Sequence, residues 1–370
     1  MIWIWLALII IGLVYRKSKV ISFFQIAFIL FLMIYNDNNP DYMNNYLTFT
    51  QVRGNFSYVL SGNWLYKFIF YIFSILGNYH LLVFFIGCIS MYLIYRTIEF
   101  YTDTYSFCFS LYLIASFVID STQLKNLLAM AIWLYFSRYL YMAYLGNRSK
   151  KNILKYLLGV ILSTSCHASF AITILYLLVL INFKTLATIS TIVGIMSALS
   201  SKFIEKWIMN LVYWISARNS GFIKFIYTKI YDYSLNSNNN VISTRLRLEV
   251  VFFIVFLFVF WRLSSTYSYK MNSSKQKLLK FALSLNIVVL LMLPFLLLST
   301  EFYRFQRNLL IIDYAAFGNL LIHKNGMREK QNRGDMTVFF YSIIPAVFYL
   351  FIDAIIWNYE NVFLRLFWLL

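Results

Sequence analysis

Three ionisable side chains of this sequence stand in polar breaks between long apolar runs, where an acid or a base could act. His167 lies in the break STSCHASF, and an imidazole with a near-neutral pKa can accept a proton from an attacking hydroxyl group. Asp41, in NPDYMNNY, could act as the base or orient that hydroxyl, and Glu249 is a further reserve. Each has a structural alternative, since His167 could be a hydrogen-bonded structural histidine and Asp41 a turn residue after Pro40.

Four arginines in the second half of the chain could bind an anion. They are Arg245, Arg247, Arg304 and Arg307. A planar guanidinium donates two parallel hydrogen bonds to a phosphate and keeps its charge, so these residues are candidate diphosphate ligands. On a helix Arg304 and Arg307 would share a face and could clamp one diphosphate. The alternatives are an ordinary helical ion pair between Arg245 and Glu249 and simple snorkelling of the later arginines to the membrane interface.

The stretch Asp120–Phe170 contains a further polar group, Gln123, Lys125 and Asn126, at the start of an apolar segment. A basic turn, NRSKK, and a second apolar segment lead from there to His167. Two hydrophobic segments thus run away from one membrane surface and back, and they bring Lys125 and His167 to the same surface. Ionisable groups at a bilayer boundary favour a functional site, although Lys125 could also snorkel and His167 could end a helix.

Composition indicates a membrane protein. Of the 370 residues 61% are hydrophobic and 12% are charged, whereas a soluble domain carries roughly 25% charged residues. Apolar runs recur along the whole chain, which predicts an all-α, polytopic transmembrane bundle. No polar stretch is long enough to bury its own core, so residues 1–370 are expected to form a single integral membrane domain.

The charge balance and the cysteines narrow the partners. The net charge is +18, but the basic residues fall mostly between hydrophobic segments. This position favours anionic lipid or phosphate ligands and argues against nucleic acid. The three cysteines, Cys88, Cys108 and Cys166, are isolated in or beside apolar runs and suit neither a metal site nor a disulfide framework. No metal and no cofactor is expected.

Basic loops predict which segments face the cytoplasm. Arg16, Lys17 and Lys19 mark the first short loop as cytoplasmic, so residues 36–78 should form an outer loop. Within that loop, Trp64–Leu76 is too short for an ordinary span of about 20 residues and is expected to lie in the interface.

The segment Ile153–Ile181 could be one long helix or two short ones that meet at His167. The later basic stretches Arg262–Lys280 and His323–Asp335 both become cytoplasmic only if the segment is split there. The split places His167 at the outer surface and makes residues 202–247 a long outer loop. It gives about 12 spans, with a range of 10–14.

Several enzyme classes lack their motif. The chain has no G-x-S-x-G, no H-E-x-x-H, no phosphate-binding Walker loop and no D-x-D pair for a nucleotide sugar. It also shows no internal repeat, which disfavours a secondary transporter. An outward-facing enzyme without a nucleotide site would need an already activated, lipid-linked donor.

The order of these motifs resembles the EpsG-like and Wzy-type bacterial polysaccharide polymerases. PDYMNNYLTF is followed by QLKNLLAMAIWLYF, then LLGVILSTSCHASF, then EFYRFQR. In that family the middle motif reads R-Q-x-[IL]-A and a later helix break reads H-x-S. Lys125 and Asn126 stand where the Arg and Gln are expected, and Ala129 matches. His167 and Ser169 match the H-x-S, although lysine lacks the bidentate geometry of arginine.

The resemblance implies a polymerase at the outer face of the bacterial cytoplasmic membrane, with a helical bundle akin to lipid-dependent (GT-C-like) glycosyltransferases. Its donor and acceptor would be undecaprenyl-diphosphate-linked glycans, and membrane lipid and a chain-length regulator would be its other partners. Arg245, Arg247, Arg304, Arg307 and Lys125 would bind the donor diphosphate, and His167 would be the leading candidate for the base. The alternatives are a lipid-linked oligosaccharide flippase, an O-antigen ligase and a membrane acyltransferase.

Overall fold

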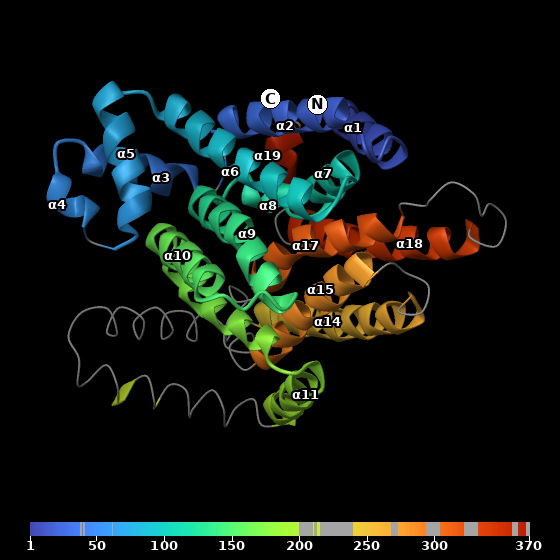
Figure 1. The fold of residues 1–370 in the computed structure, drawn as a ribbon. Coiled ribbons are helices and arrows are strands. Elements are labelled where there is room, and N and C mark those ends of the chain that lie inside the picture. Colours follow the sequence, from blue (N-terminus) through green and yellow to red (C-terminus); the bar gives the residue numbers. More distant parts are fainter. Residues whose placement is uncertain are drawn as a thin grey trace. The chain divides into compact units, whose positions relative to one another are not determined.

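The computed structural model describes residues 1–37, 39, 41–60, 62–199, 210, 213–214, 240–267, 273–293, 304–321, 332–356 and 362–367. All regular structure in these ranges is helical, and they contain no strand (Figure 1). The predicted all-α class is therefore confirmed. The chain divides into two compact units, each described here by itself. Unit 1 comprises Met1–Leu177, Asn272–Leu279 and Leu310–Leu370, and unit 2 comprises Leu178–Met271 and Lys280–Leu309.

The helices follow one another along the chain with short connections. Their bounds are α1 (Ile2–Val14), α2 (Lys19–Ile34), α3 (Tyr42–Val52), α4 (Phe56–Val59), α5 (Trp64–Leu76), α6 (Tyr79–Tyr101), α7 (Tyr105–Ile114), α8 (Phe117–Asp120), α9 (Leu124–Tyr144), α10 (Lys150–Cys166), the 3₁₀ helix η1 (Ala168–Leu180), α11 (Phe183–Leu199), α14 (Asn240–Tyr267), α15 (Ser273–Leu291), α17 (Arg304–Leu320), α18 (Asn332–Tyr349), the π-helix η3 (Leu350–Ile356) and α19 (Leu364–Phe367).

Local sequence signals explain several of these boundaries. The side chains of Ser18, Asn78 and Ser149 each accept a hydrogen bond from a backbone N–H three residues later, at 3.2, 3.0 and 3.3 Å. These bonds cap the first turns of α2, α6 and α10, whose backbone donors have no partner within the helix. Gly77 ends α5 in the left-handed region at φ 70°, a conformation that glycine adopts without steric cost.

The α9–α10 hairpin is central to unit 1, and Figure 1 shows its two helices side by side. The indole N–H of Trp133 donates to the Tyr156 hydroxyl at 3.2 Å, and that hydroxyl donates to the Thr173 carbonyl at 2.6 Å. This chain of bonds joins α9, α10 and η1. Gly159 permits the close approach, because a Cβ there would lie 2.2 Å from the Cβ of Phe136. The hairpin therefore has one well-defined packing.

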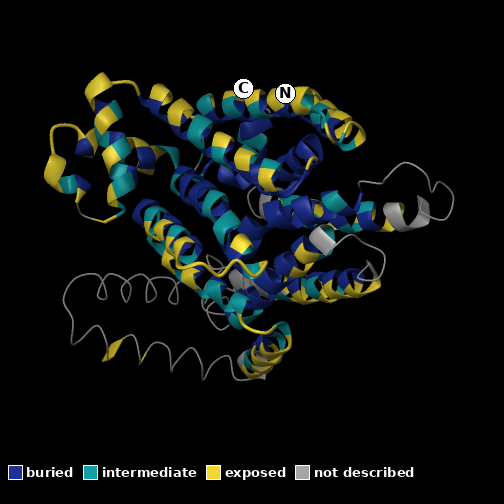
Figure 2. Ribbon diagram, in the orientation of Figure 1, coloured by how far each residue is buried: buried dark blue, intermediate teal, exposed yellow. Residues whose placement is uncertain are grey.

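The core of unit 1 lies around α7, every residue of which is buried (Figure 2). Most of the first half of α9 is also buried. Trp5 of α1 donates its indole N–H to the Leu113 carbonyl at 3.2 Å, which ties the first helix to this core. Deep burial of α7 and α9 means that residues just before α9 are held on a rigid support.

Apolar side chains on the outside of the helices agree with a membrane protein. Two helical segments in the described ranges, Tyr79–Tyr101 and Leu248–Thr266, are long and apolar enough to cross a membrane, and the other apolar helices are shorter. Val251, Val255 and Phe258 form an exposed stripe on α14 (Figure 2). Soluble proteins rarely expose such a stripe. The number of spans, about 12, stays a prediction.

The predicted outer loop 36–78 contains three helices, α3, α4 and α5. The bounds of α5 are those of the segment expected to lie in the interface, Trp64–Leu76. The outer placement of these residues stays a prediction. The other expected outer loop, 202–247, lies almost entirely outside the described residues apart from the first turns of α14.

Candidate functional site

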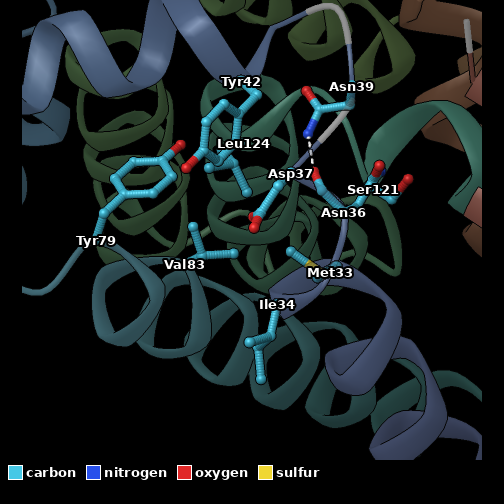
Figure 3. Close-up of a pocket in the computed structure, with 10 residues that line it drawn as sticks. All are labelled: Met33, Ile34, Asn36, Asp37, Asn39, Tyr42, Tyr79, Val83, Ser121 and Leu124. Carbon is cyan, nitrogen blue, oxygen red and sulfur yellow. Dashed lines mark hydrogen bonds between the residues drawn. The ribbon is translucent and has the colours of Figure 1, made fainter. Parts of the chain in front are cut away.

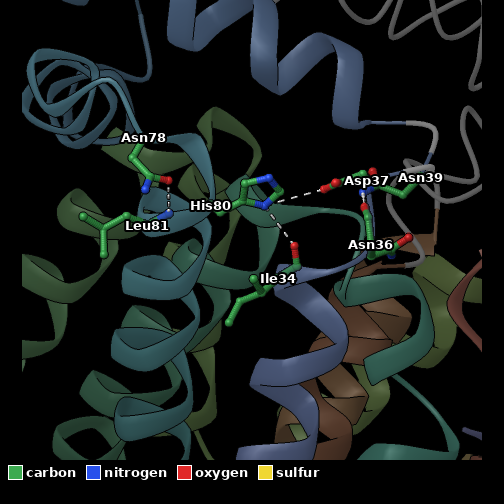
Figure 4. A network of polar contacts seen from close by, with 7 residues as sticks. All are labelled: Ile34, Asn36, Asp37, Asn39, Asn78, His80 and Leu81. Atoms are coloured by element: carbon green, nitrogen blue, oxygen red, sulfur yellow. Dashed lines mark hydrogen bonds and ion pairs between the residues drawn. The ribbon is translucent and has the colours of Figure 1, made fainter. Parts of the chain in front are cut away.

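The turn between α2 and α3 holds Asp41 in a defined position. The Asn39 side-chain amide donates to the carbonyl of Asn36 at 2.5 Å, and its oxygen accepts the backbone N–H of Asp41 at 3.1 Å (Figure 4). Asp41 is the N-cap residue of α3, but its side chain does not accept the cap hydrogen bond. Its half-buried carboxylate therefore does not serve as the helix cap.

Helix α5 packs against α3, α6 and α10 and connects three of the predicted site residues of unit 1. Tyr66 on α5 donates its hydroxyl to the side-chain oxygen of Asn45 at 2.9 Å, and both residues are buried. Burial raises the pKa of Tyr66, and the nearby Tyr79, Asp41 and Cys166 raise it further. Tyr66 thus lies close both to Asp41 and to the residue before His167.

The chain breaks at His167, as predicted. Helix α10 ends at Cys166, and His167 is extended at φ −147° and ψ 113° before η1 begins. The backbone N–H of Ala168 donates to the side-chain oxygen of Asn63 at 3.1 Å, so the loop before α5 satisfies the break. The predicted helix split at His167 is confirmed, and its outer placement stays a prediction.

A short contact orients the imidazole of His167. The Ser169 hydroxyl lies 2.7 Å from its Nδ1, and the backbone N–H of Ser169 donates to the same nitrogen at 3.4 Å. A backbone N–H can only donate, so Nδ1 is the acceptor and Nε2 carries the hydrogen of the neutral ring. This tautomer suits His167 to donate a hydrogen bond to an anionic oxygen.

Lys125 lies in the first turn of α9, next to a second lysine that the sequence analysis did not single out. Burial lowers the pKa of Lys67, and the charge of Lys125 lowers it further. The Nζ of Lys67 also donates to the carbonyl of Tyr58 at 3.3 Å. Two cations beside a helix N-terminus, which carries a partial positive charge, produce a local field that favours an anion.

Sequence analysis also gave little weight to His80. Its Nδ1 lies 3.7 Å from the Asp37 carboxylate and 3.2 Å from the carbonyl of Ile34 (Figure 4). Asn78 caps α6 and so places His80 in the first turn of that helix. The signal that could have found the pair is that a histidine and an aspartate each directly follow a polar turn.

A pocket adjoins this pair. Its volume is about 230 Å³, including space open to solvent. Figure 3 shows its lining, which comes from the end of α2, the turn to α3, the start of α6 and the turn before α9. The lining residues are Met33, Ile34, Asn36, Asp37, Asn39, Tyr42, Tyr79, Val83, Ser121 and Leu124.

The remaining predicted site residues belong to unit 2. Glu249 is fully buried in α14, and Arg307 in α17 is 4% exposed. Arg304, one turn earlier in α17, is half-buried. The backbones of Arg245 and Arg247 lie in the first turns of α14, but their side chains are outside the described residues. The two arginines of α17 therefore differ in their access to a ligand, and their roles stay predictions.

Comparison with known families agrees with this arrangement. The model of the EpsG family matches residues 20–364, which include all of the predicted site residues. The chain belongs to the EpsG family. No curated protein and no solved structure matches the chain. In this EpsG-family protein the polar residues described above are therefore interpreted from their own geometry.

Proposed function

We propose that this EpsG-family protein is a glycosyltransferase that polymerises undecaprenyl-diphosphate-linked oligosaccharide repeat units into a surface polysaccharide. It works at the outer face of the bacterial cytoplasmic membrane, as a multi-pass bundle of about 12 spans like that of the lipid-dependent glycosyltransferases. The observation that carries the proposal is the family match over residues 20–364. A growing glycan is transferred from its lipid diphosphate to the sugar end of a new lipid-linked unit.

The polar residues near α5 support this function. The reaction releases a diphosphate, which needs cations or hydrogen-bond donors close to its developing charge. Lys125, Lys67 and the N-terminus of α9 supply positive charge, and the neutral tautomer of His167 supplies a hydrogen-bond donor. In unit 2 we propose Arg304 as a further diphosphate ligand, since it is the less buried arginine of α17. The mechanism requires no cofactor, and a chain-length regulator is a proposed partner.

The test is the surface glycan of a strain that lacks this gene. A polymerase defect leaves single repeat units in place of a ladder of long chains on a gel. His167→Ala and Arg304→Ala should leave the protein inserted in the membrane but abolish the long chains. Normal chain-length distributions in both variants would contradict these roles.

The same gel separates the alternatives. Complete loss of surface glycan in the deletion strain would favour a lipid-linked oligosaccharide flippase. Long chains that stay on the lipid carrier would favour an O-antigen ligase. Either result would overturn the polymerase.

A further inference from the structure

His80 and Asp37 form a pair that lies open to solvent. Their side chains are 50% and 48% exposed. An ion pair with this exposure adds about 0–1 kcal/mol to stability. The pair is therefore not needed for the fold, and a substrate can reach it.

The hydrogen bonds of His80 define its tautomer. The Ile34 carbonyl, 46 residues earlier, can only accept, so Nδ1 of His80 is the donor at 3.2 Å. Asp37 lies on the same side of the ring, 3.7 Å from Nδ1. The neutral ring therefore presents the lone pair of Nε2, which has no partner among the described residues. A carboxylate behind Nδ1 also stabilises the imidazolium that forms when Nε2 takes a proton.

The adjoining pocket contains an unusual asparagine. Asn36 is 3% exposed, and neither its side-chain oxygen nor its nitrogen has a hydrogen-bond partner in the described part of the chain. A buried polar group without a partner costs about 1–3 kcal/mol. A ligand with hydroxyl groups would satisfy both atoms, because a hydroxyl both donates and accepts.

The other walls of the pocket also suit a sugar. Asp37 and Tyr42 come from the α2–α3 turn, and Tyr79 from the start of α6 (Figure 3). The rings of Tyr42 and Tyr79 meet edge to face with centroids 5.3 Å apart. Carboxylate, amide and phenol groups around one space are the groups that hydrogen-bond sugar hydroxyls, and aromatic rings pack on sugar C–H groups.

We propose that this pocket binds the terminal sugar of the acceptor repeat unit and that His80 is the general base. This inference rests on the proposed polymerase function. The acceptor hydroxyl oxygen bonds to the anomeric carbon of the donor, while the bond from that carbon to the diphosphate oxygen breaks. The hydroxyl proton moves to Nε2 of His80, and the electron pair of the broken bond leaves with undecaprenyl diphosphate. Solvent later takes the proton from His80.

The two histidines of unit 1 thus receive different roles. Nδ1 of His80 is a donor and Nδ1 of His167 is an acceptor, so their outward-facing nitrogens differ in protonation. His80 is arranged to accept a proton. His167 is arranged to donate a hydrogen bond, which moves the role of base from His167 to His80.

The experiment uses lipid-linked single repeat units extracted from the deletion strain and the full-length protein in vesicles. The wild-type protein should convert them into longer chains. His80→Gln should lower kcat about 10²–10⁴-fold, the usual contribution of a general base, with little change in KM for the acceptor. Imidazole added to His80→Ala should restore part of the activity. His323→Gln, at a histidine outside the described residues, is the matched control and should keep full activity.

A second set of variants tests the pocket. Asn36→Leu should raise the acceptor KM about tenfold, equivalent to one lost hydrogen bond, without lowering the unfolding temperature, since it removes a buried unpaired group. A purely structural asparagine would show the reverse. Asp37→Asn should lower kcat, and Asp37→Glu should recover part of it. Asp103→Asn, an exposed carboxylate after the opposite end of α6, should behave like wild type.

The outcomes separate the two proposals. An inactive wild-type protein overturns both the polymerase and this inference. An active wild type with normal kcat in His80→Gln, or without imidazole rescue of His80→Ala, overturns only the inference. Loss of activity in His167→Gln with imidazole rescue would return the role of base to His167.

Discussion

The side-chain oxygen of Asn63 accepts a hydrogen bond from the backbone N–H of Ala168, at 3.1 Å and across 105 residues of sequence. This bond joins the start of α5 to the break that contains His167. Asn63 itself is in the left-handed region at φ 48°, which asparagine tolerates better than most residues. One residue thus sets both the start of α5 and the position of the break.

Substitution of Asn63 should test this link. Asn63→Gly keeps the left-handed backbone but removes the acceptor, so we expect a loss of about 1 kcal/mol of stability and shorter glycan chains. Asn63→Asp keeps the acceptor oxygen and should retain the chain-length distribution. Thermal unfolding in detergent and a glycan gel provide the readouts. Equal behaviour of the two variants would remove the bond from the mechanism.

Gly159 should be intolerant of a larger residue. A Cβ there would lie 2.2 Å from Cβ of Phe136, which cannot rotate away. We therefore expect Gly159→Ala to cost about 1–3 kcal/mol by overpacking the α9–α10 hairpin.

Gly194→Ala is the matched control for that change. Its Cβ would meet only the terminal methyl group of Leu290, at 3.2 Å, and this group can move. The unfolding temperature in detergent should fall clearly for Gly159→Ala and little for Gly194→Ala. A similar fall in both would show that the hairpin is not tightly packed at Phe136.

The pair of lysines should show a measurable coupling. Burial and the charge of Lys125 lower the pKa of Lys67, so Lys125→Gln should raise it. With the folded pKa below the unfolded one, charged Lys67 costs stability at pH values below the folded pKa. That cost disappears as the pH rises through the folded pKa to the unfolded one. Lys125→Gln should therefore weaken this alkaline dependence.

NMR titration of ¹³C-methylated lysines measures this pKa, and Lys67→Arg assigns its signal. Added inorganic diphosphate should raise the pKa of Lys67 in the wild type, because a bound anion favours the charged form. Lys151→Gln, at an exposed lysine of α10, is the control and should leave the titration unchanged. An unaltered Lys67 signal in Lys125→Gln would disprove the coupling.

The hydroxyl of Tyr66 should stabilise the packing of α3 on α5. Tyr66→Phe leaves the buried oxygen of Asn45 without its donor at 2.9 Å, so we expect a loss of about 1–2 kcal/mol. Tyr71→Phe, on the same helix, is the control, because no hydrogen bond to the Tyr71 hydroxyl occurs among the described residues. Equal unfolding temperatures for the two variants would argue against the role of Tyr66.

The sequence by itself determined the helical class, the bounds of α5 and the break at His167. These features depend on near neighbours: apolar runs form helices, Gly77 ends α5, and the polar break after α10 interrupts a helix that would otherwise continue. The family resemblance was visible for the same reason, since its motifs are short and local. Helix α3 was missed because its polar residues, as in MNNY, are typical of a loop.

Only the tertiary structure decided which polar residues meet. The contacts of Asn63 with Ala168 and of His80 with Asp37 join segments far apart in the chain. Tertiary packing also decided that Arg307 is buried and that the two histidines present opposite tautomers. The pattern of apolar residues shows which face of a helix packs, but the partner of that face depends on the whole set of helix contacts. A polar side chain acquires its role from that partner.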